Sequence, residues 1–291
     1  RQLRENGMEA TMLPYNLTDY SLIDPEFEGI AVNEVPINDA FLDLMPKLRV
    51  IIKCGVGMDS IDFEATKRRG IRVSNMPGVN KEAVAELALG LMISAGRCIV
   101  SNDRAIRAGE WPKPMATTLF GKTMGIVGTG NIGTTLATLA KGFRMKVIGF
   151  DPFENDGFRA AGGEYVSFEE LVKQSDFISV HVPLVESTYH MFSKKEFEAM
   201  KENAILVTCA RGNVVDEDAL YEALTAGQIG GAGVADGDGG VTAQQQHRYR
   251  LMKLDNLVLS SHVGGLSDGA ALNYDYTAIE LLKKLLDETK Q

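Results

Sequence analysis

The feature that most constrains the fold is a glycine-rich turn, Gly128-Thr129-Gly130-Asn131-Ile132-Gly133, which follows the apolar run 124–127. The run predicts a buried strand, and the apolar spacing over 132–143 predicts a helix that starts in the turn. In this context the first glycine permits a tight bend, the second lets a pyrophosphate approach the backbone, and the third lets helix and strand pack closely. The amides at the helix start are free to bind phosphate. The turn therefore predicts a dinucleotide site that includes Gly128, Gly130, Asn131, Ile132 and Gly133.

An acid follows at the position where a dinucleotide's adenosine ribose would be bound. The predicted strand 146–150 ends at Asp151, 18 residues after Gly133, and the usual spacing is ~20. A carboxylate accepts hydrogen bonds from the ribose hydroxyls and repels a 2'-phosphate. We therefore expect NAD rather than NADP as the cofactor. The alternative is an ordinary glycine turn with an unrelated aspartate at the end of a strand.

The rest of the chain alternates between short apolar runs and segments with helical spacing, which predicts an α/β fold with a parallel, doubly wound sheet. Its 291 residues exceed the usual size of one hydrophobic core, so we expect two domains. The predicted strands are 30–32, 50–52, 124–127, 147–150, 177–182, 204–208 and 257–259. The predicted helices are 38–45, 81–96, 132–143, 168–174, 194–200, 217–226 and 270–289.

Composition limits the classes of partner. Lys and Arg total 30 against 39 Asp and Glu, and the net charge of −9 argues against general affinity for nucleic acid or an anionic membrane. Cys54, Cys98 and Cys209 lie far apart, so we expect neither a disulfide framework nor a metal site, and the reducing cytoplasm fits best. The most apolar region, 83–93, is shorter than a membrane span. The first residue is Arg1 rather than Met, which suggests a trimmed N-terminus.

Several motifs occur in an order that resembles the D-2-hydroxyacid dehydrogenase family, nearest to its phosphoglycerate-dehydrogenase-like branch. Besides the glycine turn, they are Val56-Gly57-Met58-Asp59-Ser60-Ile61-Asp62, Asn75-Met76-Pro77-Gly78-Val79-Asn80, Val84-Ala85-Glu86, Phe150-Asp151-Pro152, His181-Val182-Pro183-Leu184, Ala210-Arg211-Gly212 and His262-Val263-Gly264-Gly265. The resemblance covers nearly the whole chain. It implies a Rossmann-type NAD-binding domain, 79–266, inserted in a smaller flavodoxin-like α/β substrate domain, 1–78 and 267–291.

The resemblance also implies the reaction, which is hydride transfer between NAD(H) and a D-2-hydroxy acid or 2-oxo acid pair. Arg211 would bind the substrate's carboxylate and C2 oxygen, and His262 would exchange the proton of the C2 hydroxyl. The loop of Gly55, Val56 and Gly57 resembles the family's carboxylate cradle. Further cofactor contacts carried over from the family are Val182, Pro183, Thr188, Cys209, Ala210, Asp236, His262 and Gly264. The apolar helix 84–93 resembles the family's dimer element, so we expect a homodimer.

The sequence departs from the family pattern around the catalytic carboxylate. The position of the family's glutamate, which pairs with the histidine, holds Gly240, and 239–254 contains no acid. Without a carboxylate beside it, the imidazolium of His262 is less stabilised, and the enzyme should be a weaker acid catalyst at neutral pH. Three explanations remain open: Asp238 replaces the glutamate, the pair is absent and catalysis is slow or specialised, or the chain is a catalytically silent NAD-binding module that acts as a redox sensor or binds a partner.

Two smaller departures concern the substrate. Ser261 stands where the family has a proline before the histidine, and Thr208 where it has an asparagine before the Ala-Arg-Gly stretch. Both suggest an unusual substrate or a drifted site. The glutamine-rich segment 237–250 has no helical or strand periodicity and predicts a loop. Its residues His247, Arg248 and Arg250 could add positive charge for a phosphate or a second carboxylate.

Overall fold

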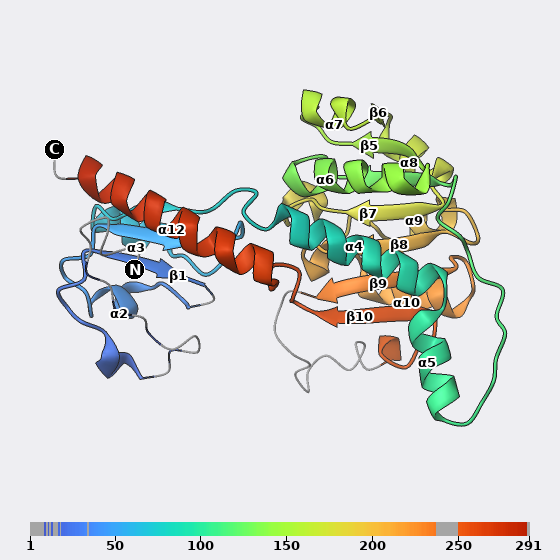
Figure 1. Ribbon diagram of the computed structural model, residues 1–291, viewed down its shortest axis with the longest axis horizontal. Coiled ribbons are helices and arrows are strands. Elements are labelled where there is room, and N and C mark those ends of the chain that lie inside the picture. The colour runs from blue at the N-terminus through green and yellow to red at the C-terminus, as the bar shows by residue number, and fades with distance from the viewer. Residues whose placement is uncertain are drawn as a thin grey trace. The chain divides into compact units, whose positions relative to one another are not determined.

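The computed structural model describes residues 19–33, 35–236 and 250–289 and the single positions 9, 11, 13 and 17. The chain divides into two compact units, one formed by Arg1–Asn80 and Ser267–Gln291 and the other by Lys81–Leu266 (Figure 1). We call them the terminal unit and the central unit. The sequence predicts the two domain boundaries after residues 78 and 266. The predicted α/β class is confirmed, because parallel sheets alternate with helices in both units.

The terminal unit contains a three-stranded parallel sheet in the order β1-β2-β3. The middle strand is buried along its whole length, with Ile51 in one apolar cluster and Val50 and Ile52 in another. The C-terminal helix covers the second cluster with Leu282 and other apolar side chains. The elements of this unit are η1 (Tyr20–Leu22), β1 (Gly29–Val32), α2 (Asp39–Leu42), β2 (Val50–Lys53), α3 (Phe63–Arg68), β3 (Arg72–Ser74) and α12 (Asp268–Glu288).

The central unit is built on a seven-stranded sheet in the order β10-β9-β8-β7-β4-β5-β6, with every neighbouring pair parallel. The order of strands reverses direction between β4 and β7, and ligands of open parallel sheets bind at the carboxyl ends beside such a reversal. The strands are β4 (Thr123–Val127), β5 (Lys146–Phe150), β6 (Gly163–Tyr165), β7 (Phe177–Val180), β8 (Ile205–Thr208), β9 (Gly231–Asp236) and β10 (Leu257–Ser261).

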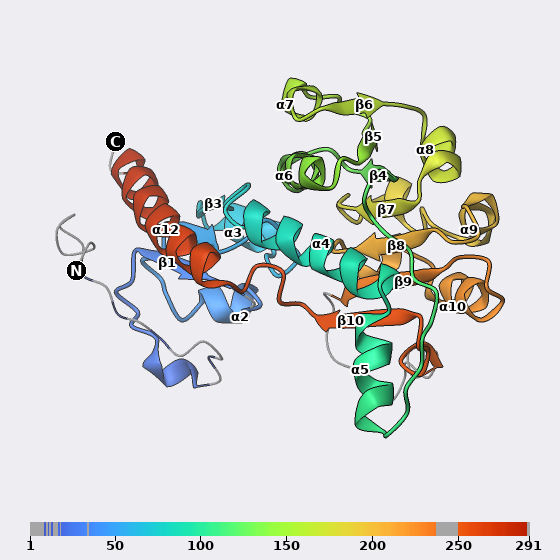
Figure 2. The ribbon, with the colours of Figure 1, turned by 45° about the vertical axis from the view of Figure 1, so that its right-hand side comes forward.

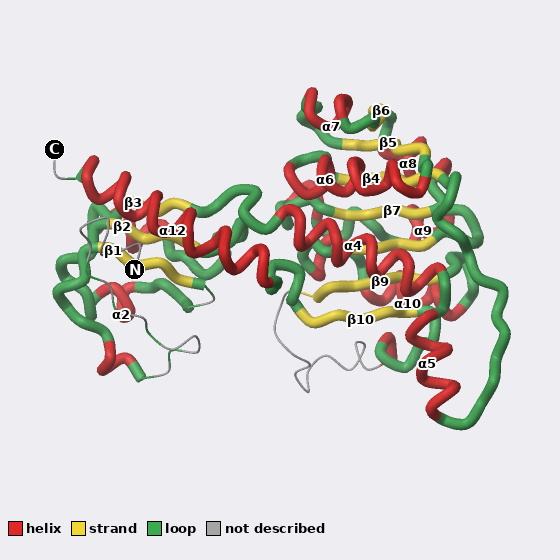
Figure 3. Tube along the Cα trace, in the orientation of Figure 1, coloured by secondary structure: helices red, strands yellow, loops and turns green. Residues whose placement is uncertain are grey.

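Helices cover both faces of this sheet, and Figure 2 shows α8, α9 and α10 on one face and α4 and α6 on the other. Some helix starts are explained by their caps: Ser167 and Glu170 form a capping box at α8, and Asp216 caps α10. The helices are α4 (Lys81–Gly96), α5 (Ile99–Arg107), α6 (Asn131–Ala140), α7 (Asp156–Ala160), α8 (Phe168–Gln174), α9 (Lys194–Ala199) and α10 (Glu217–Thr225), with the 3₁₀ turns η2 (Lys141–Phe143), η3 (Glu186–Thr188) and η4 (Gly212–Val214). Figure 3 shows how regularly these helices and strands alternate along the chain.

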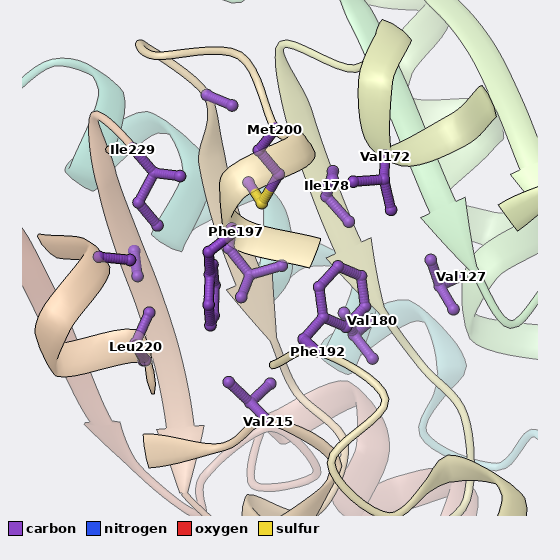
Figure 4. Close-up of a cluster of buried hydrophobic side chains, with 14 of the residues drawn as sticks. Val127, Val172, Ile178, Val180, Phe192, Phe197, Met200, Val215, Leu220 and Ile229 are labelled. Atoms are coloured by element: carbon purple, nitrogen blue, oxygen red, sulfur yellow. The ribbon is translucent and has the colours of Figure 1, made fainter. Parts of the chain in front are cut away.

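The core of the central unit consists of two apolar clusters, one on each face of the sheet. Figure 4 shows the first, in which Phe192 and Phe197 pack beside Ile178 and Val180 of β7. All four side chains are fully buried. Burying a side chain of this size stabilises a fold by about 1.5–3 kcal/mol, so these clusters hold the strand ends in fixed positions.

Periodicity missed the elements that are short or rich in small residues. The strands β3, β6 and β9 and the helices α3, α5 and α7 were not predicted from apolar patterns. In β9 the alternating small residues serve packing, because a Cβ at Gly233 would lie 2.9 Å from the Cβ of Leu91 on α4. The predicted strand 177–182 ends earlier, at Val180, so His181 and Val182 belong to the following loop.

The apolar helix α4 is covered from within the central unit. Ala85, Ala88, Leu91 and Met92 are buried in the cluster that α4 shares with α6 and the sheet. In the described part of the chain no single helix is long and apolar enough to span a membrane, although α4 and α5 together, bent by 58°, reach that length and composition.

Candidate functional site: the carboxyl edge of the central sheet

The glycine turn has the geometry that its three glycines predicted. Gly128 has a φ of 91°, and a Cβ there would lie 2.8 Å from the carbonyl carbon of His181. A Cβ at Gly133 would lie 2.2 Å from the carbonyl oxygen of Gly128, so helix α6 packs against the turn only without a side chain at this position. A Cβ at Gly130 would meet nothing within 4 Å. The first and third glycines are thus required by packing, and the second leaves open space for a ligand.

Helix α6 presents free amides beside this open space. Its N-cap, Gly130, has no side chain to cap the helix. Within the described residues the amides of Gly130, Asn131 and Ile132 donate no hydrogen bond to the protein. Unpaired amides and the helix dipole both favour an anion at this end of a helix. The turn therefore fits the pyrophosphate of a dinucleotide.

Asp151 is held in place by the turn itself. One carboxylate oxygen, Oδ2, accepts a hydrogen bond from the amide of Thr129 at 2.8 Å, and Oδ1 accepts one from the amide of Phe153 at 2.9 Å. A carboxylate oxygen has more than one lone pair, so both atoms can still accept from ribose hydroxyls. The acid is thus oriented before any ligand arrives.

The loop that follows β7 packs against the other side of the glycine turn. The amide of His181 donates to the carbonyl of Val127 at 2.7 Å, which joins the end of β7 to the end of β4. In the same loop the Thr188 hydroxyl donates to the carbonyl of Pro183 at 2.6 Å and accepts from the amide of Val185 at 2.9 Å. Thr188 thus fixes the shape of the loop in which Val182 and Pro183 lie. The structure shows this positioning of the loop, and the expected contact of Thr188 with the cofactor stays a prediction.

His181 is neutral in the folded protein. Its Nε2 lies 2.9 Å from the hydroxyl of Ser179, and its Nδ1 is buried with no hydrogen-bond partner. Burial lowers the pKa of His181 to about 4. A neutral imidazole behind the glycine turn cannot supply a positive charge for the phosphates at neutral pH, so the amides of α6 must do so.

Arg211 and His262 lie at the same edge of the sheet as the glycine turn. Arg211 follows the end of β8 by three residues, and His262 comes directly after Ser261, the last residue of β10. The arrowheads of β8, β9 and β10 point to one edge (Figure 1), because all three strands are parallel. Two strand spacings separate β8 from β10 by about 10 Å. Side chains as long as arginine and histidine can therefore reach one small molecule between them.

The burial of the two side chains differs. Arg211 is half-buried and belongs to a segment held by β8 on one side and by η4 on the other, where the amide of Val214 donates to the Arg211 carbonyl at 3.0 Å. His262 is exposed, and no carboxylate pairs with it among the side chains that the structure describes, which exclude that of Asp236. Such a histidine can exchange protons with water and with a substrate.

Comparison with known proteins decides the family. Residues 89–264 match the family model of the D-isomer specific 2-hydroxyacid dehydrogenase, NAD binding domain. This chain is a member of that family. It is 40% identical over 294 residues to a glyoxylate reductase of Thermococcus litoralis, covering 93% of this chain and 87% of the relative. It is 35% identical over 289 residues to a hydroxypyruvate reductase of Thermotoga maritima, covering 98% and 92%.

A solved structure agrees with the same assignment. The D-lactate dehydrogenase of Aquifex aeolicus, complexed with NAD and lactic acid, matches with a TM-score of 0.79 and 27% identity, covering 92% of this chain and 86% of the other. The chain is therefore an NAD-dependent oxidoreductase that transfers a hydride between 2-hydroxy acids and 2-oxo acids. The predicted family, fold, reaction class and cofactor are confirmed.

Gly240, at the position of the family's glutamate, and Asp238, one candidate to replace it, lie outside the residues that the structure describes. Asp238 and Gly240 belong to 237–249, as do His247 and Arg248. Asp236 ends β9 beside Ser261 of β10, which places its backbone next to His262, although its side chain is not described. Of the predicted basic residues in this segment, Arg250 lies with its guanidinium 5.1 Å from the ring centre of Tyr221, on α10.

The loop that carries His262 packs against α4. A Cβ at Gly264 would lie 3.4 Å from a methyl group of Val84, so the His262-Val263-Gly264 segment runs close to the helix. The amide of Val263 donates to the carbonyl of Ser261 at 2.5 Å, which bends the chain directly at the histidine. These contacts fix the backbone of His262 and leave its side chain exposed.

Cys209 and Ala210 lie between β8 and Arg211, as a groove lining would. Burial raises the pKa of the Cys209 thiol to about 12, so the thiolate is absent at neutral pH. The amide of Ala210 donates to the buried hydroxyl of Thr208 at 3.3 Å. Cys209 is thus not an activated nucleophile.

The predicted carboxylate cradle lies in the terminal unit. Gly55 has a φ of 130°, and its carbonyl accepts from the amide of Met76 at 3.0 Å. The carbonyl of Val56 accepts from the side-chain amide of Asn75 at 2.8 Å. The amides of Gly55, Val56 and Gly57 donate no hydrogen bond within the described residues. The loop thus keeps donors for an anion.

The sequence did not predict the residues whose side chains hold the glycine turn in place. Tyr165, Asn155 and Thr134 bond to Thr129, the second residue of the turn. They come from segments with no recognisable motif. Thr129 is fully buried, and a buried hydroxyl requires a partner, but this burial is visible only in the structure.

Proposed function

We propose that this dehydrogenase reduces a short 2-oxo acid with NADH, with Arg211 as the anchor of the substrate's carboxylate and His262 as the donor of the proton to the C2 oxygen. The observation that carries this proposal is the placement of both residues at the carboxyl edge of the sheet that also ends in the glycine turn. The names of the relatives, glyoxylate reductase and hydroxypyruvate reductase, support two- and three-carbon 2-oxo acids as substrates.

Each side chain has a distinct task in this proposal. Arg211 offers a planar fork of donors that matches a carboxylate, so it orients the acid as well as binding it. His262 is exposed and can recover its proton from water after each turnover. The bound nicotinamide supplies the hydride. In the terminal unit, the amides of Gly55, Val56 and Gly57 make no hydrogen bond within the described residues, which supports an anion-binding role for this loop.

We propose further that NAD is preferred to NADP. Asp151 supports this preference, since its two hydrogen bonds to backbone amides orient the carboxylate and a 2'-phosphate would meet its negative charge. The contacts carried over to Val182, Pro183, Ala210, Asp236 and Gly264 remain part of the same proposal.

We also propose a homodimer in the cytoplasm. Because α4 is covered within the central unit, its apolar character does not require a partner. Support comes instead from α5 and the segment after it, where Ile99, Ile106, Trp111 and Met115 expose 49%, 50%, 77% and 99% of their surface. The cytoplasmic setting is supported by three cysteines that form no disulfide.

A second candidate is the silent NAD-binding module, which is favoured because no described carboxylate side chain, a set that excludes Asp236, pairs with His262. The experiment that separates the two mixes purified protein and NADH with glyoxylate, pyruvate, hydroxypyruvate, 2-oxoglutarate or 3-phosphohydroxypyruvate and follows the loss of NADH absorbance. We expect oxidation with glyoxylate or hydroxypyruvate and a product of D configuration where it is chiral. Tight NADH binding with no oxidation by any of the five acids would favour the silent module.

A further inference from the structure

Every polar group of Thr129, the second residue of the glycine turn, makes a hydrogen bond. Its amide donates to Asp151 at 2.8 Å. Its carbonyl accepts from the side-chain amide of Asn155 at 2.5 Å and from the hydroxyl of Thr134 at 2.9 Å. Its own hydroxyl lies 2.7 Å from the hydroxyl of Tyr165, and the whole residue is buried. The turn is thus tied to β5, α6 and β6 through one residue.

Tyr165, at the end of the edge strand β6, closes this network. Its hydroxyl accepts from the amide of Asn155 at 2.9 Å while it shares a hydrogen bond with Thr129. Its ring is held as well, with the ring centre of Phe158 at 5.1 Å and the guanidinium of Arg159 at 4.8 Å. The tyrosine hydroxyl therefore stands at a fixed point between the turn and the loop after Asp151.

Asn155 connects the same groups from the other side. Its side-chain oxygen accepts from the amide of Phe158 at 2.8 Å and so caps α7, and its side-chain nitrogen holds the carbonyl of Thr129. Removal of the Tyr165 hydroxyl would leave both the Asn155 amide and the buried Thr129 hydroxyl short of a partner. A buried group without a partner is costly, so the loop and the turn would both shift.

We propose that Tyr165 is a positioning residue for the cofactor: through Thr129 it holds the amides of Gly130, Asn131 and Ile132 in the arrangement that binds the pyrophosphate. It also holds the loop that orients Asp151. The inference rests on the proposal that this turn binds NAD. Tyr165 needs no contact with the cofactor, because a turn that is already ordered loses less entropy when a ligand binds.

The test is Tyr165→Phe, which removes one oxygen and keeps the ring between Phe158 and Arg159. We expect the dissociation constants of NADH and of ADP-ribose, measured by calorimetry at 25 °C, to rise together by about five- to twenty-fold. ADP-ribose lacks the nicotinamide, so an equal effect places the loss at the adenosine and pyrophosphate end. At saturating NADH, kcat should stay within about two-fold, and the amide of Thr129, which donates to Asp151, should exchange hydrogen faster.

A second variant approaches the same hydrogen bond from the turn. Thr129→Val keeps the shape of the side chain and removes its hydroxyl, so it should weaken ADP-ribose binding by a similar factor. The double variant should lose less than the product of the two factors, because both changes break one shared bond. If Tyr165→Phe does not fold, Thr129→Val carries the same test.

Tyr221→Phe is a matched control. Tyr221 also lies under an arginine, with the guanidinium of Arg250 5.1 Å from its ring centre, and its hydroxyl has no hydrogen bond within the part of the chain that the structure describes. The Tyr221→Phe variant should therefore bind ADP-ribose with the same dissociation constant as the wild type.

Two results would overturn the inference. Unchanged ADP-ribose binding by folded Tyr165→Phe, even with a lower Tm, would show that the hydroxyl only stabilises the fold. If Tyr165→Phe raises the dissociation constant of ADP-ribose no more than Tyr221→Phe does, the effect is not specific to Tyr165. If the wild type itself does not bind ADP-ribose, the proposed cofactor site fails first, and the role of Tyr165 fails with it.

Discussion

At one end of the carboxyl edge of the central sheet lies the buried, hydrogen-bonded glycine turn, and at the other end lies the exposed side chain of His262. Thr129 and Asp151 are joined by a hydrogen bond, and Thr129 is buried. His262 is exposed, and none of the described carboxylate side chains, which exclude that of Asp236, pairs with it. The printed contacts that hold the glycine turn do not involve His262, so the groups expected for cofactor binding and for proton transfer are separate. The two should therefore respond separately to substitution.

The largest separation is expected for His262→Ala. Loss of the proton donor should lower kcat by about 10³-fold with the best 2-oxo acid, while the dissociation constant of NADH stays within about two-fold. Steady-state kinetics and a binding titration on one preparation measure both. His190→Asn is the control, since His190 is half-buried with a φ of 49° and asparagine tolerates that conformation. Full activity in His262→Ala would remove this residue from the mechanism.

A smaller loss is expected for Arg211→Lys. The ammonium keeps the charge but not the planar fork, so kcat/KM for the 2-oxo acid should fall by about 10²-fold, mostly through KM. NADH affinity should again change little. An equal loss of NADH binding would mean that the two ends are coupled, contrary to the comparison.

The next largest effect is expected on the free energy of unfolding, through His181 beside the glycine turn. The pKa of His181 is lowered to about 4 in the folded protein, and an unfolded histidine titrates near ~6.5, so the unfolded chain takes up the proton first as pH falls. The stability that His181 contributes is present above pH ~6.5 and is lost towards pH ~4. Between pH 7.5 and 5 the wild type should lose about 2 kcal/mol more than His181→Gln in urea unfolding. Parallel curves for the two proteins would contradict this.

The smallest effect concerns the choice of cofactor. Asp151→Asn keeps an oxygen that can accept from Thr129 but removes the charge that repels a 2'-phosphate. The ratio of kcat/KM with NADPH to that with NADH should rise by about ten-fold. A wild type that already prefers NADPH would refute the role given to Asp151.

The sequence predicted the local geometry of the glycine turn better than it predicted the positions of Arg211 and His262, for physical reasons. A glycine turn between a strand and a helix has one local geometry, so Gly128, Gly130 and Gly133 could be assigned their separate roles from spacing alone. The positions of Arg211 and His262 depend on which strands lie side by side, and β9, which separates β8 from β10, has too few apolar residues to be recognised by periodicity. Only the order of family motifs placed these two residues together.

The network around Thr129 was beyond sequence reasoning for another reason. Tyr165 lies 36 residues after Thr129, and no local pattern links a tyrosine at the end of a short edge strand to a turn. Packing decided it: Cβ atoms at Gly149 and Gly163 would lie 2.5 and 2.2 Å from the ring of Phe158, so these glycines let Phe158 lie against the sheet beside Tyr165. The spacing of glycines in strands was the only trace of this arrangement.

The most direct test of the proposed site is a crystal structure of the protein with NAD and oxalate, an unreactive mimic of a 2-oxo acid. We predict the pyrophosphate on the amides of Gly130, Asn131 and Ile132, and one end of oxalate on the guanidinium of Arg211. An oxygen at the C2 position should lie about 3 Å from a ring nitrogen of His262. A pyrophosphate bound elsewhere, or oxalate out of reach of both side chains, would contradict the proposed site.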